Sequence, residues 1–205
     1  MTTATPTAMI QMVFDGSLTP IDLEVLQGLW SDEQYLRLTD ATNWLVEFTD
    51  GRIEILPMPT YKHQAMVIAL LLRLHEVVVP LGGTVIFAAL RLQIRPGKYR
   101  EPDLLVLRDC NDPRREDRLW YGADLVMEVV SSDNPERDTQ EKRRDYAEGG
   151  VPEYWIVNPQ DATITVLELV GDSYVEHGVF RRGDTADSVV LSGFAVAVDT
   201  VLDAD

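Results

Sequence analysis

Two carboxylates, Asp103 and Glu128, lie where metal chemistry could use them. Each belongs to a short apolar run, "EPDLLVL" and "DLVMEVVSS", typical of a strand that protein covers on both faces. An ionised glutamate in such a strand costs several kcal/mol unless something compensates it. Because side chains alternate along a strand, the two runs could pair with both carboxylates on one face. The carboxylates would then repel each other unless a cation lay between them. Mg²⁺ fits, because it binds one or two carboxylates together with water and phosphate oxygens.

Glu128 could also have a purely structural role. It could pair with an arginine of the following helix, or its strand could be an edge strand with that face in water. Lys142, four residues after Asp138, could form a simple ion pair on a solvated helix face. Alternatively, it could lie over a metal site and polarise the attacking water.

Two more residues enter as weaker candidates. His63 lies near the start of a predicted helix and Glu47 lies on a predicted strand. Taken singly, both are typical of surface positions. The chain has no G-x-S-x-G or H-E-x-x-H motif, and its one cysteine, Cys110, has no cysteine or histidine at zinc-ligand spacing. Chemistry at this site is therefore expected to depend on carboxylates.

The elements that must position these residues follow from periodicity and turn signals. Ser31 and Gln34 have capping-box spacing before a helix over 32–38, and Asp50-Gly51 predicts a type I′ hairpin within "NWLVEFTDGRIEIL". Apolar residues at helical spacing predict a long helix over 61–79, and a second helix is expected over 137–150. Further strands are predicted in these runs: "TVIFAAL", "RLQI", "PEYWIV", "TITVLEL", "SYVEHGVF" and "SVVLSG". The mixture predicts an α/β or α+β fold around a mixed sheet, with a flexible N-terminal tail over 1–20 and a single domain over 21–205.

Composition limits the partners. The 205 residues carry 18 Lys and Arg against 34 Asp and Glu, a net charge of −16, which argues against a broad electrostatic grip on nucleic acid. Binding to DNA would have to use a local patch, for which short basic clusters are candidates: 95–100, 114–115, 142–144 and 181–182. We find no signal sequence and no apolar run of membrane-spanning length, so we expect a soluble, cytoplasmic protein.

Three runs, "EPDLLVL", "LVMEVVSS" and "RDTQEKRRDYAEGGVPEYWIVNP", resemble the Uma-type (Uma-two) family of predicted restriction endonucleases, within the PD-(D/E)XK nuclease superfamily. The resemblance covers most of the chain, and "YAEGGVPEYWIVNP" is its most specific part. The sequence departs from the pattern at three places: Val130 stands where the superfamily pattern places a lysine, "SSDNPERD" lacks the Ser-Pro that commonly follows the second acid, and Asn158 stands where the family commonly has aspartate.

The resemblance implies a restriction-endonuclease-like core with Asp103 and Glu128 as metal-binding carboxylates. It also implies that Lys142 supplies the missing lysine, that Glu47 and His63 belong to the site, and that the protein acts as a homodimer on DNA. The expected reaction is Mg²⁺-dependent hydrolysis of a phosphodiester, with Mn²⁺ able to substitute. One alternative is an inert nuclease-fold module that binds DNA or a protein partner. Another is metal-free hydrolysis of a glycoside by a carboxylate pair.

Overall fold

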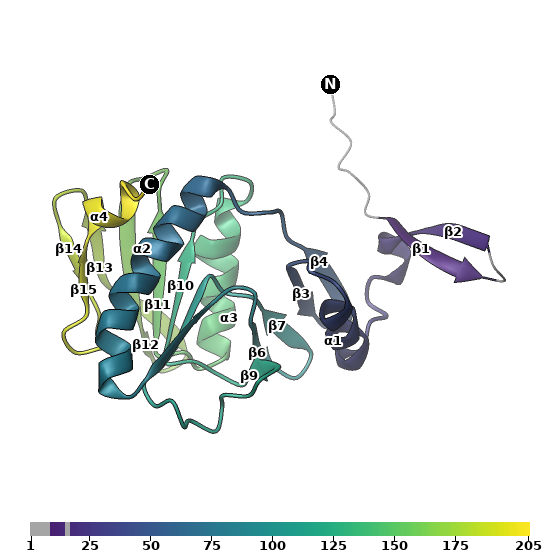
Figure 1. Cartoon of the computed structure of the whole chain (residues 1–205), viewed down its shortest axis with the longest axis horizontal. Coiled ribbons are helices and arrows are strands. Elements are labelled where there is room, and N and C mark those ends of the chain that lie inside the picture. Colours follow the sequence, from purple (N-terminus) through teal and green to yellow (C-terminus); the bar gives the residue numbers. More distant parts are fainter. Residues whose placement is uncertain (1–8, 15–16) are drawn as a thin grey trace.

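A six-stranded mixed sheet forms the centre of the protein (Figure 1). The computed structural model describes residues 9–14 and 17–205, with side chains from Leu23 onward. The strand order of this sheet is β13-β12-β11-β10-β8-β5, in which only β10 and β11 are parallel. Its strands are β5 (Thr84–Phe87), β8 (Leu104–Leu107), β10 (Leu125–Val129), β11 (Glu153–Asn158), β12 (Thr163–Val170) and β13 (Ser173–Arg181).

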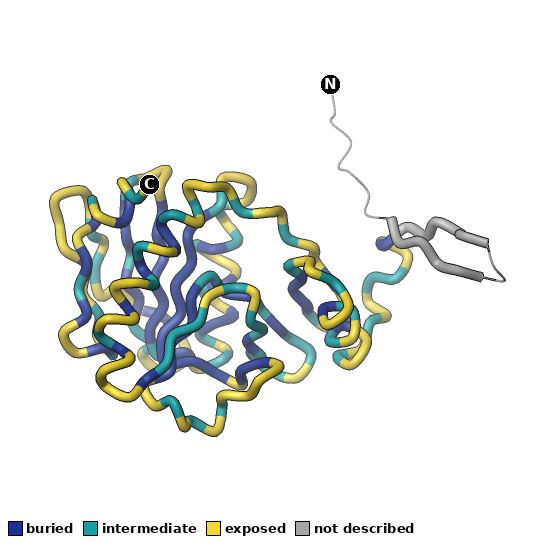
Figure 2. The backbone as a smooth tube through the Cα atoms, viewed as in Figure 1, coloured by how far each residue is buried: buried dark blue, intermediate teal, exposed yellow. Residues whose placement is uncertain are grey.

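Helices cover both faces of this sheet. The helix α2 (Tyr61–Val78) packs on one face, where its buried residues join Leu104 and Met127 in one apolar cluster. On the other face Tyr146, from α3 (Lys142–Glu148), packs with Leu105 and Val126. The alternation expected from the sequence is therefore confirmed for β8 and β10, and Figure 2 shows the central strands as buried.

A second sheet lies beside the first, in the order β4-β3-β7-β6-β9. Its strands are β3 (Val46–Thr49), β4 (Arg52–Ile55), β6 (Arg91–Arg95), β7 (Lys98–Arg100) and β9 (Leu119–Trp120). The helix α1 (Asp32–Ala41) covers it through Tyr35, whose ring centroid lies 5.1 Å from those of both Phe48 and Tyr99. This sheet brings β3 and its Glu47 close to α3.

Several local predictions are confirmed. Ser31 forms the capping box with Gln34 that starts α1, and α2 begins and ends within one residue of its predicted bounds. Asp50 and Gly51, with φ angles of 47° and 84°, form the turn between β3 and β4. These positive φ values explain why the turn uses Asp-Gly.

One strand prediction is wrong. The run "SVVLSG" is a loop whose flanks, β14 (Thr185–Asp187) and β15 (Ala195–Ala197), pair instead. The turn expected at "RPGK" is confirmed: Arg95 ends β6, Lys98 begins β7, and Pro96-Gly97 connect them. In the predicted tail, residues 1–8 and 15–16 lie outside the described residues. The rest of that range falls in the strands β1 (Met9–Phe14) and β2 (Ser17–Asp22), which pair antiparallel.

The remaining elements are short. They are η1 (Leu23–Leu26), η2 (Val79–Leu81), the π-helical turn η3 (Arg137–Glu141) that leads into α3, and α4 (Val198–Leu202). Contrary to our expectation, the segment 61–81 is long and apolar enough to cross a membrane by length and composition alone. One face of this segment is packed on the sheet.

Candidate functional site

Asp103 and Glu128 lie side by side at one end of the β8 and β10 pair. The register joins Met127 to Leu104, so the next residues along the two strands are Glu128 and Asp103. The Val129 N–H donates to Asp103 Oδ2 at 2.8 Å, and the Asp103 N–H lies 3.4 Å from Glu128 Oε2. The structure therefore brings the two carboxylates together at this end of the strand pair, where Glu128 contacts Lys142 of α3 and Asp103 contacts His63 of α2.

Glu128 is buried on a central strand, so the edge-strand alternative is excluded. Its partner from the following helix is a lysine rather than an arginine. Lys142 Nζ lies 2.7 Å from Glu128 Oε1, and the Tyr146 hydroxyl donates to the same oxygen. These contacts hold Oε1 and leave Oε2 on the side of Asp103.

Lys142 is the centre of a buried group that we call the carboxylate–lysine cluster: Glu47, Glu128, Asp138 and Lys142. Its ammonium lies 3.1 Å from Asp138 Oδ1 and 3.7 Å from Glu47 Oε1. The pair of Asp138 and Lys142 has the predicted i, i+4 spacing, but it is buried instead of solvated. The turn η3 and the start of α3 therefore aim both side chains into the protein.

Glu47 is held by cations. Arg137 Nη2 lies 2.6 Å and Arg100 Nε 3.4 Å from Glu47 Oε2. Burial alone would raise the pKa of this carboxyl, but Lys142, Arg137 and Arg100 together lower it to about 2. Glu47 lines a separate cavity, bordered by Arg52 and Ile53, and contacts the Asp103 segment through the Glu101 N–H, which lies 3.4 Å from Glu47 Oε1.

His63 contacts Asp103 directly. It lies in the first turn of α2, where Thr60 caps the helix by accepting from the His63 N–H. His63 Nε2 lies 3.2 Å from Asp103 Oδ2. Burial lowers the pKa of the imidazole, but the hydrogen bond to Asp103 and the charges of Asp103 and Glu128 together outweigh burial, so the pKa is raised. Because His63 and Val129 both act on Oδ2, Asp103 Oδ1 stays available for a further ligand.

Burial also shifts the pKa values of the other acids. It raises the pKa of Glu128, with smaller contributions from Asp103 and Asp138, while Lys142 opposes the shift. The pKa of Lys142 is raised because nearby carboxylates outweigh its burial. Lys142 is therefore protonated at neutral pH, and its ammonium lies within hydrogen-bond distance of Glu128.

Glu101 was not predicted from the sequence. This buried residue accepts a hydrogen bond from the Val46 N–H at 3.2 Å, and burial raises its pKa to about 7. It lines the same cavity as Asp103 and Glu128. Its place directly before Pro102-Asp103 was the available signal, but no local pattern indicated that it would be buried.

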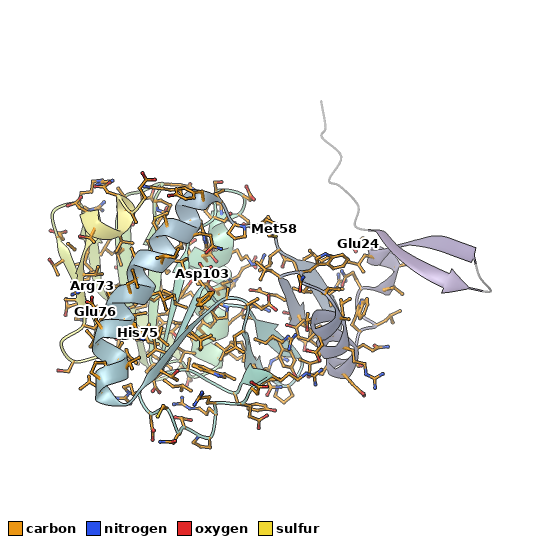
Figure 3. The ribbon with its side chains drawn as sticks, viewed as in Figure 1. Glu24, Met58, Arg73, His75, Glu76 and Asp103 are labelled. Atoms are coloured by element: carbon orange, nitrogen blue, oxygen red, sulfur yellow. The ribbon has the colours of Figure 1, made fainter. Side chains whose placement is uncertain are left out.

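A cavity of about 320 Å³ opens over the two carboxylates. Its polar wall includes His63, Lys142 and Asp138, and an apolar wall comes from the segment 56–59 that joins β4 to α2. Figure 3 shows Asp103 in the interior beside α2, and Met58 on that connecting segment. Met58 lines the cavity and is 80% exposed, so a ligand bound in the cavity would contact it.

The carboxylate oxygens of Asp103 and Glu128, which line this cavity, suit a hard divalent cation. Asp103 Oδ1 and Glu128 Oε2 come from neighbouring strands, and oxygen is the ligand atom that Mg²⁺ prefers. Within residues 9–14 and 17–205 no group of three or more His, Cys, Asp or Glu side chains is arranged to hold a metal. Two carboxylates completed by water and phosphate oxygens are still a usual Mg²⁺ environment, so the residues fit.

The basic clusters expected to contact DNA are largely compensated by acids. Lys98 lies 2.9 Å from Asp145, and Arg114 lies 2.7 Å from Asp124. The other paired cations of these clusters are Arg95, Arg100, Lys142 and Arg182. Arg144 is among the few cluster members with no ion pair in the described part of the chain.

Comparisons with known proteins bear on the family and the fold of the chain. A family model, Uma2, described as "Putative restriction endonuclease", matches residues 32–199. A crystal structure from Anabaena variabilis, titled as that of "a putative nuclease belonging to DUF820", has a TM-score of 0.66 at 18% identity. The match covers 82% of this chain and 97% of that one. No curated protein matches the chain. The resemblance seen in the sequence is thus confirmed, and the chain belongs to the Uma2 family.

Proposed function

We propose that this protein is a Mg²⁺-dependent endonuclease that hydrolyses DNA phosphodiester bonds in the cavity over β8 and β10. The observation that carries the proposal is the convergence of Asp103 and Glu128 on the wall of the cavity, with Lys142 in contact with Glu128. The family description and the fold of the similar structure support a nuclease.

Asp103 and Glu128 would hold the ion, which supplies a water of lowered pKa and positive charge at the scissile phosphate. His63 orients Asp103 through Oδ2, so that Oδ1 faces the ligand. Tyr146 and Lys142 fix Glu128 through Oε1. Each carboxylate is thus oriented by a second contact, as metal ligands commonly are.

Lys142 acts as a cation in this proposal. Its raised pKa means that it does not accept a proton at neutral pH, so it orients water or stabilises phosphate charge. Glu47, bound by Arg137 and Arg100, keeps the Lys142 ammonium in place instead of binding a second ion.

The test compares the parent with Asp103→Asn and Glu128→Gln on supercoiled plasmid DNA with Mg²⁺, Mn²⁺ or EDTA. We expect cleavage by the parent with either metal, none with EDTA, and a loss of about a hundredfold or more in each variant. Asp161→Asn is the matched control, because Asp161 is exposed and lies outside the cavity. Equal cleavage by parent and both variants would remove the site from the proposal.

A second candidate is a nuclease-fold module that binds without cutting. Two observations favour it: Glu128 already has a cation in Lys142, and most basic clusters are paired with acids. Calorimetry separates the two functions. Uptake of Mg²⁺ or Mn²⁺ that Glu128→Gln abolishes supports the nuclease, and no uptake at millimolar metal supports the inert module.

A further inference from the structure

The outer face of α2 carries more apolar surface than the core of this chain uses. Five residues of its inner face are buried: Met66, Val67, Leu70, Leu74 and Val78. The opposite face carries a second row, the α2 seam, made of Tyr61, Ala65, Ile68, Leu72, His75 and Val79. Four of these six side chains, Tyr61, Ile68, Leu72 and Val79, are between 42% and 72% exposed. Much of the outer side of α2 is accordingly coloured as exposed in Figure 2.

The seam has the spacing of a helix–helix contact. Its members alternate at four and three residues, the a and d positions of a heptad repeat. Packing in the core accounts only for the apolar residues of the inner face, whereas the segment 61–81 as a whole is long and apolar enough to span a membrane by length and composition alone. A continuous exposed apolar row of this kind marks a surface that another molecule covers.

We propose that the α2 seam binds the α2 seam of a second copy of this chain, antiparallel, about a two-fold axis at the level of residue 70. In that register Ile68 faces Leu72 of the second copy, and Ala65 faces its His75. Tyr61 then faces its Val79. Two of these three layers set a large side chain against a smaller one, and the same contacts recur on the other side of the two-fold axis.

Charge favours the antiparallel direction. Lys62 and Glu76 lie on the same flank of the seam, and the proposed register places Lys62 beside Glu76 of the second copy, twice by symmetry. A parallel pair would instead set Lys62 against the other flank, which carries Gln64 and Leu71. In the single chain Lys62 donates to the Ala204 carbonyl at 2.8 Å, and Glu76 pairs with Arg73. Figure 3 shows Arg73, His75 and Glu76 together on this part of α2.

A lipid surface is the competing partner, and two features disfavour it. The inner face of α2 is packed on the sheet, so the helix could lie on a membrane but not cross it within this fold. The net charge of −16 also opposes approach to anionic lipid. The inference goes beyond the proposed function and does not rest on it.

The experiment measures molar mass by sedimentation equilibrium over a wide concentration range. A single helix pair covers less than the roughly 800 Å² per partner of a standard interface, so we expect a reversible dimer. Leu72→Glu should raise the dimer dissociation constant roughly a hundredfold, because it buries two unpaired carboxylates. Val175→Glu, at a 45% exposed position on β13, is the matched control and should leave it unchanged. Circular dichroism melting verifies that each variant is folded.

Charge exchange tests the direction of pairing. Lys62→Glu and Glu76→Lys should each weaken the dimer by roughly fivefold, and the double variant should restore it. A monomeric parent at the highest concentration overturns the proposal, as does a dimer that Leu72→Glu leaves intact. Failure of the double variant to restore affinity overturns the antiparallel register. A monomeric parent that floats with phosphatidylcholine vesicles would assign the seam to lipid.

Discussion

The two faces of the six-stranded sheet are built on different principles. On the α2 face, Leu70 and Leu74 pack with Met127 and Trp155 in an apolar cluster. The one buried acid beside Trp155 in the described residues, Glu153, accepts hydrogen bonds from neutral N–H groups. On the α3 face a similar apolar cluster gives way at one end to the carboxylate–lysine cluster. The first face stabilises the fold by burial, whereas the second keeps charges where they are stable only in one another's presence. Function is therefore expected to depend on the α3 face.

The largest expected difference between the faces is the response to loss of one side chain. Lys142→Met leaves Glu128 and Asp138 buried without their cation, so the free energy of unfolding should fall by about 3–5 kcal/mol at pH 8. The loss should shrink toward pH 5, because Glu128, whose pKa is raised by burial, takes up a proton. Urea denaturation at both pH values measures it.

Leu70→Ala is the comparison on the α2 face. It should cost about 2–5 kcal/mol through the cavity it leaves, with equal loss at both pH values. A pH-independent loss in Lys142→Met would contradict our description of the cluster as a set of mutually dependent charges.

The pH dependence of the free energy of unfolding should distinguish two buried acids near α3, Glu101 and Glu47, by a smaller effect. Glu101, with its pKa raised from 4.5 to about 7, contributes stability below pH 4.5 that is lost as the pH rises through 7. This shift corresponds to roughly 3 kcal/mol. Glu101→Gln should therefore match the parent at pH 4.5 and be more stable than it at pH 8. The measurement is a pH series of urea denaturation.

Glu47→Gln should change the free energy of unfolding at pH 8 in the opposite direction. Its pKa of about 2 lies below the ordinary value, so Glu47 contributes stability above pH 4.5 that is lost as the pH falls toward 2. The variant should be less stable than the parent at pH 8. If both glutamine variants shift stability in the same direction, the contrast between the two carboxyls is wrong.

The sequence predicted which residues share a face of the sheet better than it predicted the carboxylate–lysine cluster. Period-2 alternation placed Asp103 and Glu128 on one face, since strand geometry leaves only two choices. Asp-Gly and the capping box were equally local signals. The run "SVVLSG" was misread because β-rich composition does not reveal that its flanks pair with each other.

The cluster needed information that no short stretch carries. Glu47 comes from β3 of the second sheet, and Arg137 reaches it across 90 residues of chain. Tyr146 was read as part of a family motif, yet its hydroxyl contacts Glu128 only because α3 crosses β10 at that point. Such contacts follow from packing of the two sheets and α3, which sequence periodicity does not specify.

The smallest expected effect concerns how Glu128 is oriented. Tyr146→Phe removes one of the two donors to Glu128 Oε1 and keeps the buried ring, so the free energy of unfolding should fall by about 1–2 kcal/mol. If Tyr146 acts through Glu128, the same change in a Glu128→Gln background should cost less, because the two residues share one interaction. Calorimetry with Mg²⁺ gives a second readout, in which Tyr146→Phe should weaken binding while Tyr174→Phe, which alters a tyrosine bonded to the Val151 carbonyl, should not. If the stability losses are additive and the Mg²⁺ affinity is unchanged, Tyr146 stabilises the fold by packing and does not orient Glu128. This end of the α3 face would then resemble the α2 face, which stabilises the fold by burial.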